Sequence, residues 1–181
     1  MEQLSFLDNA FKIENSNTFV ALDVETTGFS PIFNELIEVS AIKYEDNKKI
    51  DSLTTLIKPK GDLPEEITKL TGITIEMLKD APSCEEVMPK LIDFIGNNKI
   101  VAHNANFDYS FLQNKSNNSF AKNEVIDTLK LSKKMYPNLP NHKLNTISKE
   151  IGITEDGYHR AEFDTECCAK IYIKYLEDLK K

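Results

Sequence analysis

The feature that most limits the fold of this chain is a change of pattern after its first third. Residues 18–24, 35–44 and 49–57 are rich in strand-forming side chains and are joined by short links, which predicts three antiparallel strands. Short helical segments and brief apolar runs follow them. A meander followed by alternating helices and strands predicts an α/β fold, with a mixed sheet flanked by helices.

Residues beyond the meander are expected to form helices and two short strands. Ser83 is a suitable N-cap, and Gly96 a suitable stop, for a helix with apolar residues at helical spacing. The other expected helices cover residues 64–70, 74–79, 106–114, 128–136, 143–151 and 161–180, and the expected strands cover residues 99–103 and 124–127.

The length of 181 residues fits one domain with a sizeable core. Residues 1–17 are polar and are interpreted as an N-terminal arm before a domain of residues 18–181. The arm lacks the regions of a signal peptide, and no apolar run is long enough to span a membrane. Three cysteines without a CxxC spacing argue against a zinc site and favour a reducing compartment. We therefore expect a cytoplasmic protein without a membrane partner.

The net charge of −7 limits how this chain binds polyanions. Strong, sequence-independent binding to phosphate backbones needs clustered Lys and Arg. A net negative charge is still compatible with an enzyme that contacts only the last few nucleotides of a strand. Arg160 is the only arginine, which an AT-rich genome explains.

Asp23 and Glu25 stand two positions apart in an otherwise apolar strand. Side chains at i and i+2 share one face of a strand, so the two carboxylates are expected to lie together. Like charges in proximity disfavour joint ionisation, and the pair therefore needs a compensating partner. The alternative, a frayed strand end in solvent, is not excluded by the pair alone.

Asp108 and Asp164 are predicted to point inward from the first turns of two helices. Asp108 shares a helix face with Phe111 and Leu112, and the helix dipole favours an acid at this position. Asp164 belongs to the apolar stripe of the last helix, where no lysine stands one turn away. An acid on such a stripe needs a partner. Each acid, taken alone, also fits an ordinary helix start.

Divalent cations are the simplest common partner of these four acids. An all-oxygen ligand set suits Mg²⁺ or Mn²⁺ and argues against zinc. Two such ions about 3.5–4 Å apart activate a water and stabilise the leaving oxygen of a phosphodiester. His159 lies five residues before Asp164 and follows Gly157, so a mobile loop could bring its imidazole to the attacking water as a general base. The alternative is a surface loop histidine, and His103 and His142 are interpreted as structural or solvated.

Three motifs resemble the DnaQ-like, DEDDh exonuclease superfamily. The family's D-x-E-T-T-G is residues 23–28 here, its H-N-A-x-F-D is residues 103–108, and its H-x-A-x-x-D is residues 159–164. Residues 70–74 are similar to the family's segment after the third strand. The resemblance runs from about Thr18 to the C-terminus without a departure at a catalytic position. Within the superfamily, the chain is similar to the epsilon proofreading subunit of bacterial DNA polymerase III and to PolC-type exonuclease domains.

The resemblance implies an RNase H-like topology for the five-stranded sheet and a role for each motif. The residues implied to hold two Mg²⁺ or Mn²⁺ ions are Asp23, Glu25, Asp108 and Asp164, and His159 would be the general base. The residues implied near the terminal nucleotide are Thr26, Thr27, Gly28, Leu70, Asn104 and Phe107. Core packing is an equal alternative for Leu70 and Phe107, and a plain turn is the alternative for Thr27 and Gly28.

The implied activity is that of a 3′→5′ exonuclease. Such an enzyme hydrolyses terminal phosphodiesters to nucleoside 5′-monophosphates, here on 3′ ends of single-stranded or frayed DNA, in proofreading or repair. A DNA polymerase partner could supply the affinity for DNA that a chain with a net negative charge lacks. No residue reads the 2′-hydroxyl unambiguously, so an exoribonuclease that trims RNA ends remains open. A catalytically idle binding module is an alternative of another class, and the intact set of acids with His159 speaks against it.

Overall fold

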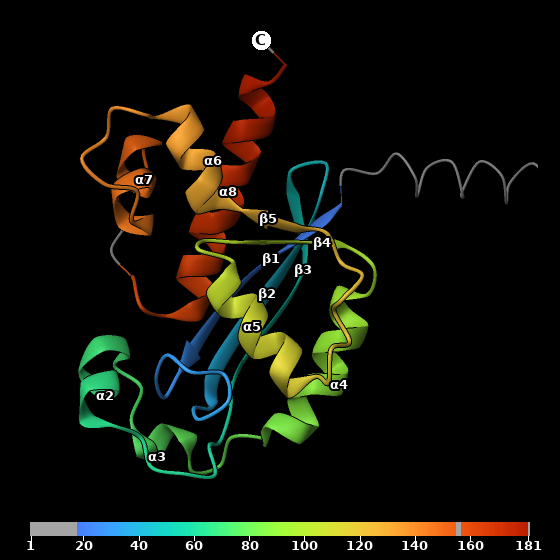
Figure 1. The fold of residues 1–181 in the computed structure, drawn as a ribbon, viewed down its shortest axis with the longest axis vertical. Helices are drawn as coiled ribbons and strands as arrows, with labels where there is room; N and C mark the ends of the chain where they lie inside the picture. The colour runs from blue at the N-terminus through green and yellow to red at the C-terminus, as the bar shows by residue number, and fades with distance from the viewer. Residues whose placement is uncertain (1–17, 155–156, 181) are drawn as a thin grey trace, which may run out of the picture.

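A five-stranded mixed sheet runs through the computed structural model, which describes residues 18–154 and 157–180 (Figure 1). Its strand order is β3-β2-β1-β4-β5. The meander consists of β1 (Phe19–Thr26), β2 (Leu36–Glu45) and β3 (Lys48–Leu56), while β4 (Lys99–Ala102) and β5 (Val125–Asp127) extend it in parallel with β1. The predicted α/β fold with three antiparallel and then parallel strands is confirmed. The predicted arm, residues 1–17, lies outside the described residues.

The helices cover both faces of this sheet. They are α2 (Glu65–Thr71), α3 (Ile75–Leu78), α4 (Cys84–Ile95), α5 (Asn106–Lys115), α6 (Thr128–Met135), α7 (Leu144–Glu150) and α8 (Ala161–Asp178). Each expected helix and strand is present, with bounds that differ by at most two residues. None of the helices in the described ranges is long and apolar enough to cross a membrane.

The alternation of side chains along β1 divides the core into two layers. Val20, Leu22 and Val24 pack with α4 and α5 on one face of the sheet. Phe19 and Ala21 point to the other face, where they pack against α8. Because Asp23 and Glu25 continue this second set, they are directed toward the side of the sheet that α8 covers.

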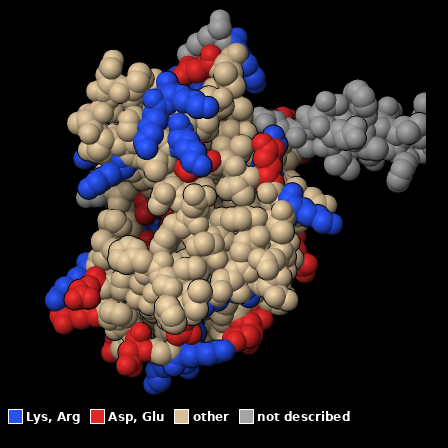
Figure 2. All heavy atoms as spheres, viewed as in Figure 1, with Lys and Arg blue, Asp and Glu red and all other residues tan. Residues whose placement is uncertain are grey.

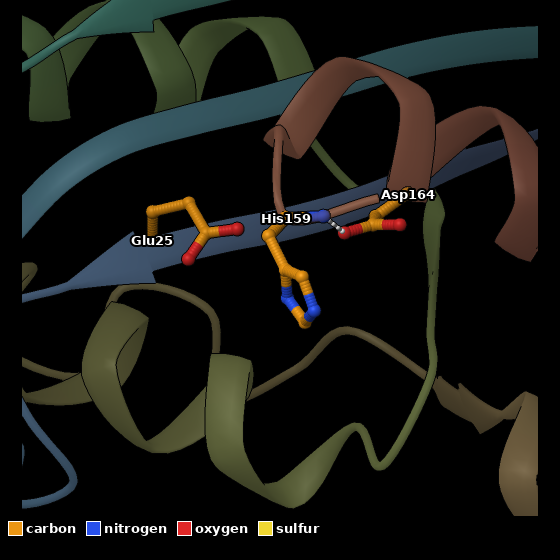
Figure 3. A group of neighbouring side chains, drawn as sticks. All are labelled: Glu25, His159 and Asp164. Atoms are coloured by element: carbon orange, nitrogen blue, oxygen red, sulfur yellow. Dashed lines mark hydrogen bonds between the residues drawn. The ribbon is translucent and has the colours of Figure 1, made fainter. Parts of the chain in front are cut away.

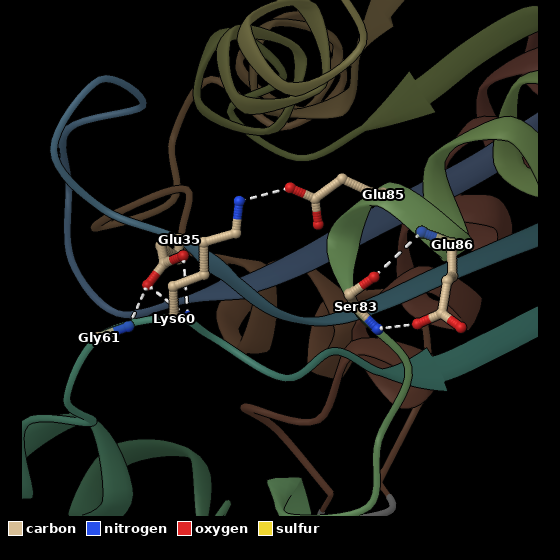
Figure 4. A network of polar contacts seen from close by, with 6 residues as sticks. All are labelled: Glu35, Lys60, Gly61, Ser83, Glu85 and Glu86. Carbon is tan, nitrogen blue, oxygen red and sulfur yellow. Dashed lines mark hydrogen bonds and ion pairs between the residues drawn. The ribbon is translucent and has the colours of Figure 1, made fainter.

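Polar contacts fix the segments that follow β1 and β3 (Figure 4). Ser83 caps α4, as the sequence predicts, and forms a reciprocal capping box with Glu86. Glu35, just before β2, accepts backbone hydrogen bonds from Lys60 and Gly61. The Lys60 ammonium in turn pairs with Glu85 of α4. These contacts join the end of the β1–β2 loop to α4, and they hold the loop that follows the acid-bearing strand.

Candidate active site

Asp23 and Glu25 lie on one face of β1 near its C-terminal end, and both are half-buried. The pairing of β1 with β2 shifts register directly after Glu25, at Thr26. Such irregularities re-aim side chains and are over-represented next to active sites. The strand therefore presents both acids at the point where it leaves the regular ladder.

Asp108 and Asp164 are buried in the first turns of α5 and α8. Asp108 Oδ1 accepts a hydrogen bond from the backbone N–H of Val24, 3.1 Å away, which places it beside the segment between the two strand acids. Asp164 Oδ2 accepts a hydrogen bond of 2.9 Å from the backbone N–H of His159. Its other oxygen, Oδ1, is buried and has no hydrogen-bond partner among the described residues.

Glu25, His159 and Asp164 form a compact group (Figure 3). One ligand atom from each of them lies within 4.8 Å of the other two. His159 is exposed and adopts the left-handed region with a φ of 68°, which brings its backbone N–H to Asp164. Its ring lies beside the two carboxylates in Figure 3. The structure thus brings the predicted histidine to the predicted acids.

Burial and mutual repulsion raise the pKa of the four acids. Burial raises the pKa of Glu25 to about 8, with added repulsion from Asp164 and Glu38. The pKa of Asp108 is raised to about 7 and that of Asp164 to about 6, chiefly by burial in both cases. Burial, followed by repulsion from Asp108, raises the pKa of Asp23 well above its ordinary value. Burial and repulsion therefore disfavour the charged forms of the four acids, and the positive charge of Arg160 offsets this only in part at Glu25.

This arrangement fits bound divalent cations. The four carboxylates offer hard oxygen ligands of the kind that Mg²⁺ and Mn²⁺ prefer. The buried Asp164 Oδ1 requires a partner that no described residue supplies. A cation would satisfy this oxygen and would offset the repulsion among the acids.

Glu38 and Arg160 form an ion pair beside the site that the sequence did not predict. Glu38 is 2% exposed on β2 and stands opposite Glu25 in the sheet register. Its carboxylate accepts hydrogen bonds from Arg160 Nη2 at 2.8 Å, from Arg160 Nε at 3.3 Å and from the Ala161 backbone N–H at 3.0 Å. The pair fixes the residues that directly follow His159. An acid within the apolar run of residues 36–42 and a single arginine were the available signals.

Thr26, Thr27 and Gly28 form the turn that follows β1. Thr26 Oγ1 donates to the Gly28 carbonyl at 2.6 Å, and Thr27 Oγ1 accepts from the Glu35 backbone N–H at 3.0 Å. A Cβ at residue 28 would lie 2.7 Å from the side chain of Asn34, so glycine permits this close approach. Both hydroxyl groups therefore stabilise the turn, next to the strand acids.

The other residues expected near the terminal nucleotide lie in different surroundings. Asn104 lines a cleft of about 850 Å³ together with His159 and Asp164. Phe107 packs against Phe29, with ring centroids 6.4 Å apart. Phe29 itself is 89% exposed on the β1–β2 loop and was not predicted from the sequence.

Leu70 lies apart from these residues on α2. It is 52% exposed there, so the alternative of core packing does not describe it. None of the contacts found in the described ranges joins Leu70 to the four acids.

Known proteins share both the sequence and the fold of this chain. The RNase_T family, described as exonuclease, matches residues 20–172. The chain is 43% identical over 165 residues to DNA polymerase III PolC-type of Caldanaerobacter subterraneus subsp. tengcongensis. It is 40% identical over 173 residues to DNA polymerase III PolC-type of Bacillus subtilis. These matches cover 90% and 93% of this chain, but the chain spans only 12% of the length of each relative.

Solved exonuclease structures have the same architecture. Exonuclease X in complex with 5′ overhanging duplex DNA superimposes with a TM-score of 0.73 at 24% identity, over 88% of this chain and 92% of that chain. Escherichia coli Exonuclease I in complex with a dT13 oligonucleotide gives a TM-score of 0.76 at 21% identity, over 88% of this chain and 40% of that chain. The RNase H-like topology implied by the motifs is confirmed. The chain therefore belongs to the RNase_T exonuclease family, and the DnaQ-like relationship that its motifs indicate is confirmed.

Proposed function

We propose that this chain is a metal-dependent 3′→5′ exonuclease that removes nucleotides from DNA ends in proofreading or repair. The proposal rests on one observation: ligand atoms of Glu25, Asp164 and His159 lie within 4.8 Å of one another. Asp108 lies close enough to raise the pKa values of Asp23 and Glu25. Family membership supports nuclease chemistry at this place.

Two Mg²⁺ or Mn²⁺ ions are proposed to be the cofactors. The proposed ligands are Asp23, Glu25, Asp108 and Asp164. When bound, such ions supply an activated water and stabilise the charge that develops on the leaving oxygen. Within the chain, the hydrogen bonds from Val24 to Asp108 and from His159 to Asp164 orient two of the carboxylates.

His159 is proposed to be the general base. Its neutral imidazole accepts a proton from water as the water oxygen attacks phosphorus and the bond from phosphorus to O3′ breaks. The products are a nucleoside 5′-monophosphate and a strand one nucleotide shorter, whose O3′ takes a proton from solvent. The exposed position of His159 at the mouth of the acid cluster suits this role.

The terminal nucleotide is proposed to lie against the β1–β2 turn and α5. Thr26, Thr27 and Gly28 would contact it with the turn, Asn104 and Phe107 would contact it from the start of α5, and Leu70 would approach from α2. Association with a DNA polymerase is proposed because the relatives are named DNA polymerase III and are far longer than this chain.

A comparison of substrates tests this proposal. Single-stranded DNA, mismatched duplex DNA and RNA of matched sequence, each labelled at the 5′ end, are incubated with Mg²⁺ or Mn²⁺. We expect the labelled DNA strands to shorten in steps of one nucleotide and RNA to be digested more slowly. Faster digestion of RNA would identify an exoribonuclease. No digestion of any substrate would identify a catalytically idle module.

A further inference from the structure

The cleft beside the acids extends well beyond them. Its floor includes His103 and Asn104, one wall comes from α6, and the other comes from residues 141–145 at the start of α7. His159 and Asp164 line one end of it. Lys133 on α6 and Lys143 before α7 line it as well, and both are exposed.

His103 and His142 hold the two walls of the cleft together. His103 Nε2 donates to the His142 carbonyl at 2.9 Å, and its Nδ1 lies 3.0 Å from Thr128 Oγ1 at the start of α6. Burial lowers the pKa of His103, and Thr128 Oγ1 also donates to the Ala102 carbonyl at 3.2 Å. His142 Nδ1 lies 3.3 Å from Ser132 Oγ, also on α6. Hydrogen bonds therefore join the two walls, and the fold fixes the shape of the cleft.

The charge of these walls is opposite to that of the whole chain. Residues 128–149 contain five lysines and no acid, whereas the chain has a net charge of −7. Lys133, Lys134 and Lys143 form no ion pair among the described residues, and Lys130 approaches Asp127 only at 3.9 Å. Figure 2 shows Lys side chains gathered over α6, above a hollow in which acidic atoms are visible.

We propose that this cleft guides the nucleic-acid strand on the 5′ side of the bond that is cut, with Lys133 and Lys143 at its phosphates. The inference rests on the proposed exonuclease function. Lysines neutralise phosphates without reading sequence, and positively charged grooves of this kind track single strands. The terminal nucleotide is assigned to the β1–β2 turn and the start of α5, and Asn104, His159 and Asp164 form the end of the cleft that meets this position. The rest of the cleft, between α6 and residues 141–145, is left for the nucleotides that precede it. The apolar side chains of Leu129 and Leu144 provide contacts for sugars and bases.

Charge reversal with two substrates of different length tests the proposal. The variants are K133E/K143E and, as a matched control, K90E/K122E, which changes two exposed lysines that do not line the cleft. The substrates are a labelled DNA strand of twenty nucleotides and the p-nitrophenyl ester of thymidine 5′-monophosphate, which is too short to enter the cleft. The measured quantity is the ratio of kcat/KM for the strand to kcat/KM for the ester.

We expect K133E/K143E to lower this ratio by about tenfold through KM, and to reduce the salt dependence of strand affinity by about 0.7 in slope for each lost phosphate contact. K90E/K122E should leave the ratio within about twofold of the wild type, because scattered surface charges contribute little. A ratio that is unchanged in K133E/K143E, or an equal loss for both substrates, would overturn the proposal.

If the proposed exonuclease function is wrong, the wild type hydrolyses neither substrate. Strand binding is then compared by fluorescence anisotropy, where K133E/K143E must weaken the Kd more than K90E/K122E does. Equal Kd values for the two variants would overturn the strand-binding cleft on its own.

Discussion

At the scale of single residues, the site consists of carboxyl groups that the fold buries close to one another. Asp108 is only 3% exposed, and although it accepts a hydrogen bond from Val24, burial still raises its pKa to about 7. Asp164 has one satisfied oxygen and one that is buried without a partner in the described ranges. In the absence of cations, each of these groups is stabilised by losing its charge.

Asp108→Asn should therefore melt at a higher temperature than the wild type in buffer with EDTA. The amide oxygen retains the acceptor for Val24, while the substitution removes one negative charge from the cluster. For a chain of this size, each kcal/mol of relieved repulsion raises Tm by about 2–4 °C. Mg²⁺ should stabilise the wild type more than the variant, because binding to the native state raises its stability by mass action. Thermal melts that give the same Tm for both proteins, with and without Mg²⁺, would contradict a shared acidic site.

His159→Ala should lower turnover by about 10²–10⁴-fold, as the loss of a positioned general base does. Metal affinity should change little, because hard oxygen sites need no imidazole. Calorimetric titration with Mn²⁺ measures the metal affinity of both proteins, and single-turnover rates measure the loss of activity. If metal binding falls in proportion to activity, His159 is a ligand, which its distance of less than 4.8 Å from Glu25 and Asp164 allows.

At the scale of helices and strands, the Glu38–Arg160 pair fixes the start of α8 to β2. Arg160→Ala should be destabilising, because it leaves the Glu38 carboxylate buried and without its cation, but by less than the about 3–5 kcal/mol of a fully buried pair, because the Arg160 side chain is 48% exposed. Glu38→Gln should cost less, since the amide keeps an acceptor for the Ala161 N–H and Arg160 is half-exposed to water. Urea denaturation of both variants measures these costs. A smaller loss for Arg160→Ala than for Glu38→Gln would contradict this assignment.

The Glu38–Arg160 pair is an example of a contact that could not be predicted from the sequence. The shared face of Asp23 and Glu25 was predictable, because the two-residue period of a strand is a local property. The inward positions of Asp108 and Asp164 follow in the same way from helical periodicity. Glu38 meets Arg160 across 122 positions of sequence. That contact depends on the register of β1 with β2 and on where α8 crosses the sheet, and neither is encoded in a local pattern.

At the scale of the whole molecule, the acid cluster should make the stability of the metal-free protein depend on pH. A group whose pKa is raised on folding contributes stability at low pH, and this contribution is lost as the pH rises through the raised pKa. The relevant values are about 6 for Asp164, about 7 for Asp108 and about 8 for Glu25. The free energy of unfolding in EDTA should therefore fall between about pH 5 and pH 8. The lowered pKa of the half-buried His103 acts in the opposite direction, but this single group is outweighed by the several acids with raised pKa values.

Guanidinium titrations at several pH values in EDTA measure this decrease. With saturating Mg²⁺ the decrease should become smaller, because bound cations favour the charged acids. Glu25→Gln, which removes the group with a pKa of about 8, serves as the matched variant and should show a shallower decrease. A free energy of unfolding that rises steadily over this pH range in EDTA would argue against the buried cluster.

We propose that this molecule removes nucleotides from 3′ ends with metal ions held by its four acids. The most direct measurement follows a DNA strand labelled at its 5′ end, with Mg²⁺, with excess EDTA, and with Asp23→Ala in place of the wild type. The wild type with Mg²⁺ should shorten the labelled strand one nucleotide at a time. Excess EDTA should stop this digestion, and the Asp23→Ala substitution should nearly abolish it. Full activity of the wild type in excess EDTA would contradict a metal-dependent mechanism.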